Sequence, residues 1–135
     1  MPPEIGAYAE LESLTLHGHL FTELPPEAGS LYALGRLEIH RARLRSLPKE
    51  IGRLTKLETL SLDFTELTGL PPEIGSLHCR RRLSLKNCPA FAMVPPEISR
   101  CKKLTHVDLT HVPERKNLAA QLRRWLPGCD VSDLP

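Results

Sequence analysis

The sequence predicts an α/β solenoid, a stack of short similar units whose strands form one parallel sheet of about five strands, closed by a C-terminal helix. A glutamate next to a proline or lysine recurs every 23 or 24 residues (27 − 4 = 23; 97 − 73 = 24), as Glu4, Glu27, Glu50, Glu73 and Glu97. Leucine occurs 25 times against three Phe, two Tyr and one Trp. The core must therefore consist of many small, similar layers rather than of a few large aromatic residues.

The strand of each unit is predicted by alternation. In TLSLD, residues 59–63, Leu60 and Leu62 point to one side of a strand while the polar residues point to the other. The same phase recurs in four further pairs: Leu14 and Leu16, Leu37 and Ile39, Leu83 and Leu85, and Val107 and Leu109. These strands should stack as a parallel sheet about 20 Å across.

A short helical turn is predicted where each unit reverses direction. Pro71 and Pro72 cannot donate ladder hydrogen bonds, whereas proline fits a first helical turn and Glu73 suits its positive end. Ile74 and Leu77 would then face the core, and Gly75 would allow the turn to pack closely on the sheet. The same apolar spacing recurs as Ile51 with Leu54 and as Ile98 with Cys101.

The pattern changes after Leu109. Residues 114–131 place Leu118, Leu122 and Trp125 or Leu126 at helical spacing, and the following Pro-Gly pair ends the helix. We expect Trp125 to seal the core rather than to bind a ligand. Cys129 and Val131 are candidates for a short final strand.

The clearest unit, LPKEIGRLTKLETLSLDFTELTGL at 47–70, resembles the leucine-rich repeat, L-x-x-L-x-L with a further leucine five residues on. Its L-P-x-E-I-G-x-L segment is similar to the cytoplasmic class of about 23 residues found in Ras-associated, plant intracellular and bacterial proteins. The resemblance implies a right-handed β-α superhelix forming a single domain, 1–135. Its parts are a half repeat at 1–10, repeats at about 11–33, 34–56, 57–79 and 80–103, a last strand at 104–112 and a cap at 113–135.

Several positions depart from the family pattern. The slot that the family fills with asparagine after the strand holds His19, Ala42, Thr65 and Cys88. The family's asparagine ladder therefore does not carry over, although a hydroxyl or thiol can still satisfy a buried backbone group weakly. Arg80 occupies a leucine slot, and one extra residue lies within 86–91, so we expect the fourth unit to be distorted. Ala28 in place of isoleucine should leave the second unit thinly packed.

The chain begins within a repeat, because PPEIG at 2–6 returns at 71–75. The first strand is therefore expected to be poorly covered at Tyr8, Leu14 and Leu16. Three explanations stay open: missing upstream sequence, contact with another molecule, or a tolerated frayed end. A homodimer through this edge is one hypothesis, since an open edge strand invites pairing with a second copy.

Composition limits the possible partners. Lys plus Arg number 18 and Asp plus Glu 16, a formal net charge of +2, which is too balanced for the electrostatic affinity of nucleic-acid binders. No run approaches the roughly 18 apolar residues of a membrane span, and no secretion signal is recognisable. We therefore expect a cytoplasmic protein with protein partners, not nucleic acid or membrane. The abundance of arginine and proline favours a bacterial source.

The cysteines are expected to be free thiols. Cys79, Cys88, Cys101 and Cys129 form no C-x-x-C pair, and an even count is weak evidence for disulfides without a signal peptide. Three of them occupy slots expected to be buried, where a neutral thiol is usually inert. Cys79 is the one expected at the surface.

Neither catalysis nor a cofactor is predicted. The sequence contains no nucleophile elbow, H-E-x-x-H, phosphate loop or dinucleotide fingerprint. His17 and His40 should lie about 5 Å apart on adjacent strands, with His19 close by. Two or three imidazoles could ligate zinc or copper, but no carboxylate or thiolate at ligand spacing completes the set. We expect no enzyme, no metal and no cofactor.

The outward strand positions are the predicted partner-binding residues, because they are polar, varied and regularly spaced. They are Arg36, Glu38, His40, Arg41, Thr59, Ser61, Asp63, Phe64, Arg82, Ser84, Lys86, His106 and Asp108. The arginines, with Arg81 and Arg80 beside Arg82, favour an acidic patch on a protein partner. Phe64 is the expected hot spot at the rim, with a core role beside Leu67 as the alternative.

These features predict a non-catalytic protein–protein interaction module that binds through the concave face of the sheet. The alternative is a structural or self-assembling fragment, or the truncated sensor part of a larger protein, that oligomerises through its uncovered N-terminal edge.

Overall fold

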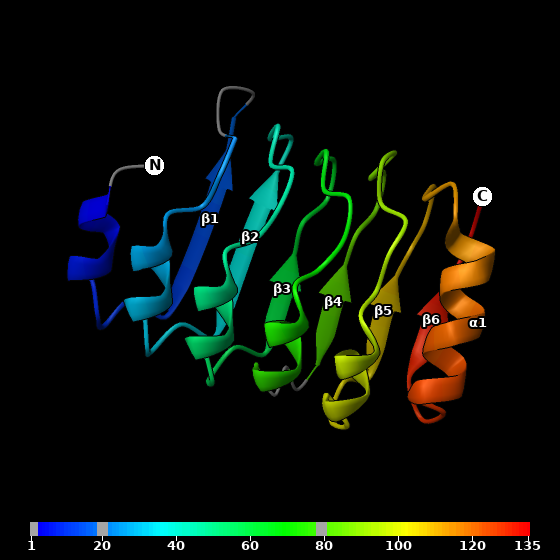
Figure 1. The fold of residues 1–135 in the computed structure, drawn as a ribbon. Coiled ribbons are helices and arrows are strands. Elements are labelled where there is room, and N and C mark those ends of the chain that lie inside the picture. Colours follow the sequence, from blue (N-terminus) through cyan, green and yellow to red (C-terminus); the bar gives the residue numbers. More distant parts are fainter. Residues whose placement is uncertain (1–2, 19–21, 78–80) are drawn as a thin grey trace.

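The computed structural model describes residues 3–18, 22–77 and 81–135. The predictions for His19, Cys79 and Arg80 fall outside these ranges. Six parallel strands follow one another in chain order as a single sheet (Figure 1). Their bounds are β1 Ser13–His17, β2 Arg36–His40, β3 Thr59–Ser61, β4 Arg82–Ser84, β5 His106–Asp108 and β6 Asp130–Ser132.

The expected reversal turns are present as 3-10 helices on one side of the sheet (Figure 1). They are η1 Pro3–Ala7, η2 Pro26–Ser30, η3 Lys49–Arg53, η4 Pro72–Ser76 and η5 Pro96–Arg100. Proline occupies the first turn of η2, η4 and η5, where its missing N–H costs nothing. Ile74 and Leu77 are buried as predicted.

The strand register aligns equivalent residues of every unit. Leu37 pairs with Leu14 and Leu60, Leu60 with Leu83, and the row continues through Val107 to Val131. The inward row from Leu37 onward is at most 6% exposed, so it forms one continuous core. The sheet has six strands rather than about five, because Val131 continues the row as the candidate final strand.

The C-terminal helix, α1 Arg115–Trp125, covers the last repeat as predicted. Leu118, Ala119 and Leu122 are buried, and the backbone N–H of Leu126 donates to the Leu122 carbonyl at 2.7 Å to close the helix. Trp125 packs against the core but stays only partly buried. The seal expected of Trp125 is therefore incomplete, because the smaller leucines already fill the layer beneath it.

The asparagine slot is filled by two groups that bond the same carbonyl. The Thr65 hydroxyl donates to the Leu62 carbonyl oxygen at 2.9 Å, and the Cys88 thiol donates to it at 3.1 Å. The expected weak satisfaction of a buried backbone group is thus confirmed. The first strand is also exposed as expected: Leu14 and Leu16 are only partly buried, and Tyr8 is 62% exposed.

The glycine of each turn has a different role from the predicted one. A Cβ placed on Gly75 would lie 2.6 Å from the backbone oxygen of Glu97, in the turn of the next unit, so the close contact is with that turn and not with the sheet. Gly29 stands in the same relation to Glu50, again at 2.6 Å. Ser99 replaces glycine only in η5, the last 3-10 turn, whose neighbour is α1.

This contact predicts that Gly75→Ser destabilises the protein by about 1–3 kcal/mol, because the new side chain collides with backbone and forces adjacent turns apart. The matched control is the reverse exchange, Ser99→Gly, which should cost no more than about 1 kcal/mol. Urea unfolding followed by circular dichroism measures both. Equal losses in the two variants would contradict the turn-to-turn contact.

Candidate functional site

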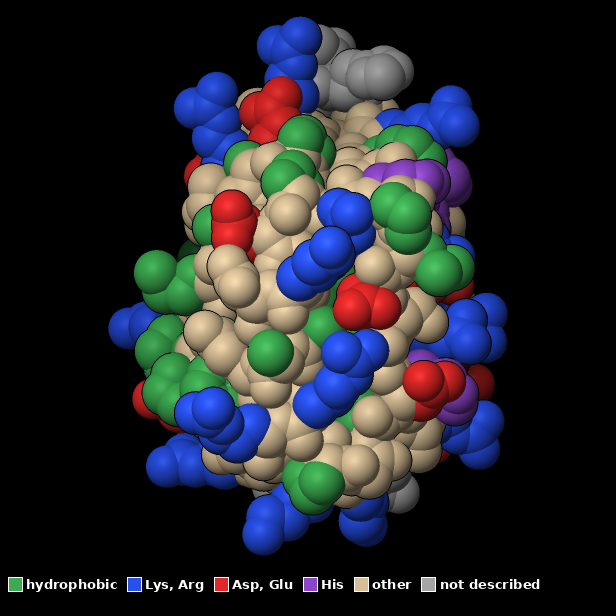
Figure 2. All heavy atoms as spheres, turned by 90° about the vertical axis from the view of Figure 1, so that its right-hand side faces the viewer, with side chains coloured by type: hydrophobic (Ala, Val, Ile, Leu, Met, Phe, Trp, Pro, Cys, Tyr) green, Lys and Arg blue, Asp and Glu red, His purple; other side chains and the backbone are tan. Residues whose placement is uncertain are grey.

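The open face of the sheet carries a hollow of about 420 Å³ that extends over β2 to β5. Its lining residues are Arg36, Glu38, Thr59, Ser61, Asp63, Arg81, Arg82, Ser84, Lys86, Thr105 and His106. Figure 2 views the molecule from the end that carries α1 and shows histidine, acidic and basic side chains together along its right flank, on the side of the sheet. The hollow is polar and open to solvent.

The structure brings together nine of the thirteen predicted residues in this hollow and places four elsewhere. Asp108 lies beside it and pairs through Oδ2 with the Lys86 ammonium at 3.4 Å. His40 stacks toward His17, and Arg41 and Phe64 line a separate groove. Arg81 and Thr105 line the hollow without having been selected. Both precede their strands by one residue, so the alternation pattern alone did not assign them to the open face.

The floor of the hollow consists of small side chains held by one carboxylate. Ser61 and Ser84 are 8% and 5% exposed. Asp63 Oδ1 accepts hydrogen bonds from the Ser84 hydroxyl at 2.6 Å and from the Lys86 backbone N–H at 2.9 Å. Asp63 is therefore committed to joining β3 to β4, and a ligand would meet its second oxygen at most.

Cations dominate the rim. Arg36, Arg81, Arg82 and Lys86 face the hollow against the two carboxylates of Glu38 and Asp63. Two of these cations have long ion pairs: Arg36 Nη1 lies 3.6 Å from Glu38 Oε1, and Arg81 Nε lies 3.7 Å from Glu58 Oε2. Such exposed pairs are weak and can be exchanged for an incoming anion at little cost.

Asp108 keeps its charge despite partial burial. Burial alone would raise the pKa of this carboxyl, but hydrogen bonds from Thr110 and the neighbouring Lys86 ammonium outweigh it, so the pKa is lowered. Oδ1 accepts the Thr110 backbone N–H at 3.0 Å. The ionised Asp108 carboxylate therefore stabilises the folded protein at a pH above its unfolded-state pKa. This stabilisation is lost as the pH falls through the lower folded-state pKa.

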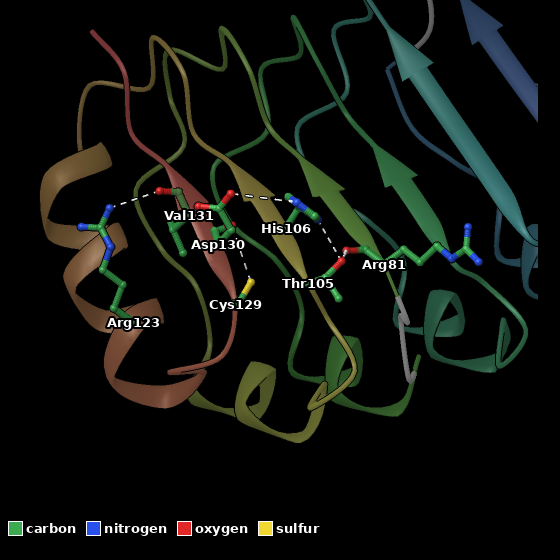
Figure 3. Close-up of polar contacts among 7 residues, drawn as sticks. All are labelled: Arg81, Thr105, His106, Arg123, Cys129, Asp130 and Val131. Carbon is green, nitrogen blue, oxygen red and sulfur yellow. Dashed lines mark hydrogen bonds and ion pairs between the residues drawn. The ribbon is translucent and has the colours of Figure 1, made fainter.

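Polar contacts that link four residues, Arg81, Thr105, His106 and Asp130, close the C-terminal end of the hollow (Figure 3). The Thr105 hydroxyl donates to the Arg81 carbonyl oxygen at 2.8 Å, so its oxygen can only accept at 2.9 Å from His106 Nδ1, which must carry the proton. His106 Nε2 then faces Asp130 Oδ2 at 3.9 Å. Since its proton is already donated to a carbonyl, the Thr105 hydroxyl is placed to position His106 rather than to react.

Phe64 lies at the surface, in the groove beside the hollow, and not in the core. Its side chain is 47% exposed, and the Arg41 guanidinium carbon lies 5.5 Å from the ring centroid. The alternative core role beside Leu67 is therefore wrong. Phe64, Arg41, Asn87 and His111 occupy the same position in successive units and all have positive φ, between 55° and 63°. A bulky side chain rarely adopts this conformation, whereas asparagine adopts it readily.

The histidine pair lies as the spacing predicted. The ring centroids of His17 and His40 are 5.2 Å apart, and His40 Nε2 lies 3.6 Å from Glu38 Oε2. Within 3–18, 22–77 and 81–135, no group of three or more histidine, cysteine or acidic side chains could hold a metal ion. This pair alone does not define a metal centre.

Three of the cysteines are buried free thiols: Cys88, Cys101 and Cys129. Burial raises the pKa of Cys88, and burial together with Asp130 raises that of Cys129 to about 11. Both thiols are therefore neutral at physiological pH and poor nucleophiles. No helix in the described part of the chain has the length and apolar character needed to span a bilayer.

Comparison with known proteins supports the repeat fold. Residues 56–77 match the Leucine Rich Repeat family. No curated protein sequence matches the chain. A leucine-rich repeat protein of Leptospira interrogans superposes with a TM-score of 0.90 at 35% identity over 98% of this chain, which spans 33% of that protein. In fold and in repeat sequence, the chain is a leucine-rich repeat protein.

Two plant receptors share the fold at lower identity. The leucine-rich repeat ectodomain of the receptor kinase SOBIR1 from Arabidopsis thaliana has 25% identity and a TM-score of 0.68, over 83% of this chain and 63% of that one. A plant peptide hormone receptor, RGFR1, solved in complex with RGF2, has 26% identity and a TM-score of 0.64, over 83% of this chain and 22% of that one. The similarity is thus to the repeat arrays of longer proteins.

The backbone at Phe64 predicts that Phe64→Asn stabilises the protein, by up to about 1 kcal/mol, because asparagine relieves the left-handed strain and little buried area is lost. Thermal unfolding compared with the matched Asn87→Phe variant measures the effect, and Asn87→Phe should be destabilised. A melting temperature that falls for Phe64→Asn would show that the ring supports the fold.

Proposed function

We propose that the chain is a non-catalytic module that binds a protein partner through the concave, open face of its sheet. The observation that supports this proposal most directly is the hollow, a rigidly spaced set of polar side chains that the fold leaves uncovered. Arg36 and Arg81 are paired by long, exposed contacts, which an acidic group of a partner can replace. Its Thr105 hydroxyl is engaged with a carbonyl, which favours recognition over group transfer.

The partner surface is acidic in this proposal. Four cations line the hollow with two carboxylates, while Glu58 and Asp108 pair with Arg81 and Lys86 from beside it, so the charges are balanced and the arginines carry the argument for an acidic partner. Arg36, Arg81 and Arg82 each carry a planar guanidinium, which suits bidentate contacts to carboxylates. A plant peptide hormone receptor of similar fold was solved in complex with RGF2, which supports a peptide or protein as the class of ligand.

Phe64 is the proposed apolar contact at the edge of this surface. It lines a groove of about 370 Å³ with Arg41, Arg43, Asn87 and neighbouring residues. An aromatic ring that is 47% exposed, already stacked with a guanidinium, can bury further area against a partner. Phe64→Ala should therefore weaken binding without lowering the melting temperature.

The setting we propose is the bacterial cytoplasm. The resemblance of the L-P-x-E-I-G-x-L segment to the cytoplasmic class supports this compartment, and the 35% identity to a Leptospira interrogans protein supports a bacterial source. Buried thiols at Cys88 and Cys129 that form no disulfide suit a reducing compartment. Neither the binding nor the fold calls for a cofactor.

Exchange of the two rim arginines tests the proposal. Arg36→Ala with Arg82→Ala should weaken capture of the partner from native lysate by about tenfold or more, since each lost charged contact costs of the order of 1 kcal/mol. The matched control, Arg53→Ala with Arg100→Ala, removes the same charge from the 3-10 helices and should capture normally. Quantitative mass spectrometry compares the captured proteins. Identical capture by both variants would contradict binding through the sheet.

The alternative function, self-assembly through the N-terminal edge, has one observation in its favour. Leu14 and Leu16 are only partly buried and Tyr8 is 62% exposed, so the edge of β1 could gain apolar area in a dimer. Sedimentation over a wide concentration range separates the two proposals. A binding module should remain a monomer, whereas a dimer that Leu16→Lys dissociates would favour assembly.

A further inference from the structure

A second cavity lies where the last repeat meets the C-terminal cap. Its volume is about 600 Å³, which is within the range of sites for small organic ligands. Two segments far apart in the sequence form its walls, 102–105 after η5 and 125–129 at the end of α1, both at the lower right of Figure 1. Among the described residues, only Thr105 borders both this cavity and the hollow on the sheet.

The floor of the cavity is apolar and uncharged. Leu104, Leu126 and Cys129 are buried, at 3%, 5% and 8% exposed. Cys129 precedes β6 beside Thr105 on the neighbouring strand, as Figure 3 shows. Its thiol remains neutral, because burial and Asp130 raise the pKa of Cys129 to about 11. Such a floor favours the hydrocarbon body of a ligand over an ion.

One wall is aromatic. Trp125 contacts the core on one side and leaves the rest of its indole in the cavity, because Leu122 and Leu126 already fill the layer that the tryptophan was expected to seal. A flat indole wall stacks with aromatic rings and offers a large apolar area without a conformational change. Trp125 is also the chain's single tryptophan, so its signals report on this site alone.

The mouth is cationic. Lys102 and Lys103 are both exposed, and within the described ranges neither forms an ion pair or hydrogen bond. Asp130, which follows the lining residue Cys129, is turned toward His106 on the sheet side. A purely structural role for the lysines would be to offset the negative C-terminal end of α1, but Arg123 and Arg124 already occupy its last turn.

We propose that this cavity binds a small organic anion, an aromatic or aliphatic body bearing one carboxylate or sulfonate. The body lies against Trp125 and Leu126, and the anionic group is held at the mouth by Lys102 and Lys103. This site is separate from the protein-binding face, so its success or failure is independent of the proposed function.

The site is tested by titrating the intact chain with anilinonaphthalene sulfonate at low ionic strength. The chain is labelled with a nitrogen isotope so that binding can also be followed by NMR. The probe should bind one-to-one and saturably, and the single indole N–H resonance of Trp125 should shift with the same binding curve. Lys102→Gln with Lys103→Gln should weaken binding about tenfold, because both cations at the mouth are lost. Lys49→Gln with Lys56→Gln removes the same charge elsewhere and should change the affinity less than about twofold.

A neutral probe separates charge recognition from simple apolar adsorption. Phenylnaphthylamine has the same aromatic body without the sulfonate, and the Lys102/Lys103 exchange should leave its binding unchanged. The proposal is overturned if the sulfonate does not saturate, if the Trp125 resonance stays in place, or if both lysine variants bind alike. A lowered melting temperature with unchanged affinity would assign the lysines to the helix end and also overturn it.

Discussion

Successive 3-10 turns of this solenoid lie too close together for a Cβ between them, and the rest of the architecture depends on this constraint. Backbone hydrogen bonds hold neighbouring strands about 4.8 Å apart, whereas α-helices with their side chains need about 10 Å. A stack with α-helices on its outer side would therefore curve strongly. Short turns that meet glycine to backbone, as at Gly29 and Gly75, bring the spacing on that side closer to that of the strands. The opposite face then stays shallow, which explains why its hollow is broad and open.

The same constraint orders the charges on the open face. Since every unit repeats in register, an ion pair forms most easily between positions about one repeat apart. Arg81 with Glu58, Lys86 with Asp108 and Arg45 with Glu66 all follow this rule. Charged groups of neighbouring units are thus paired across the sheet, although Arg36 and Glu38 pair within β2, and a distortion of one repeat alters the surface of two.

Periodicity predicted most of the fold, because the period and the inward residues are properties of the local chain. The contacts between stacked units, in contrast, are not properties of the local chain. The glycine of the turn was recognisable, but its contact with Glu97 became visible only once two units lay side by side. Thr105 was not predicted as a site residue for the same reason, since its place in the hollow depends on its hydrogen bond to the Arg81 carbonyl in the preceding unit. The left-handed backbone at Phe64 likewise belongs to a turn that alternation does not describe.

The position of the aromatic residues follows from the thickness of the layers. In the described ranges, Phe91 is the one fully buried aromatic side chain, and it lies in the unit that contains an extra residue. A regular unit of 23 residues fills its layer with leucine and isoleucine and leaves no room for a ring. Tyr32 and Phe64 are therefore displaced to the surface, at 57% and 47% exposed, and Trp125 stays only partly buried against the core. Contact with another molecule would bury this exposed aromatic area and so stabilise the chain.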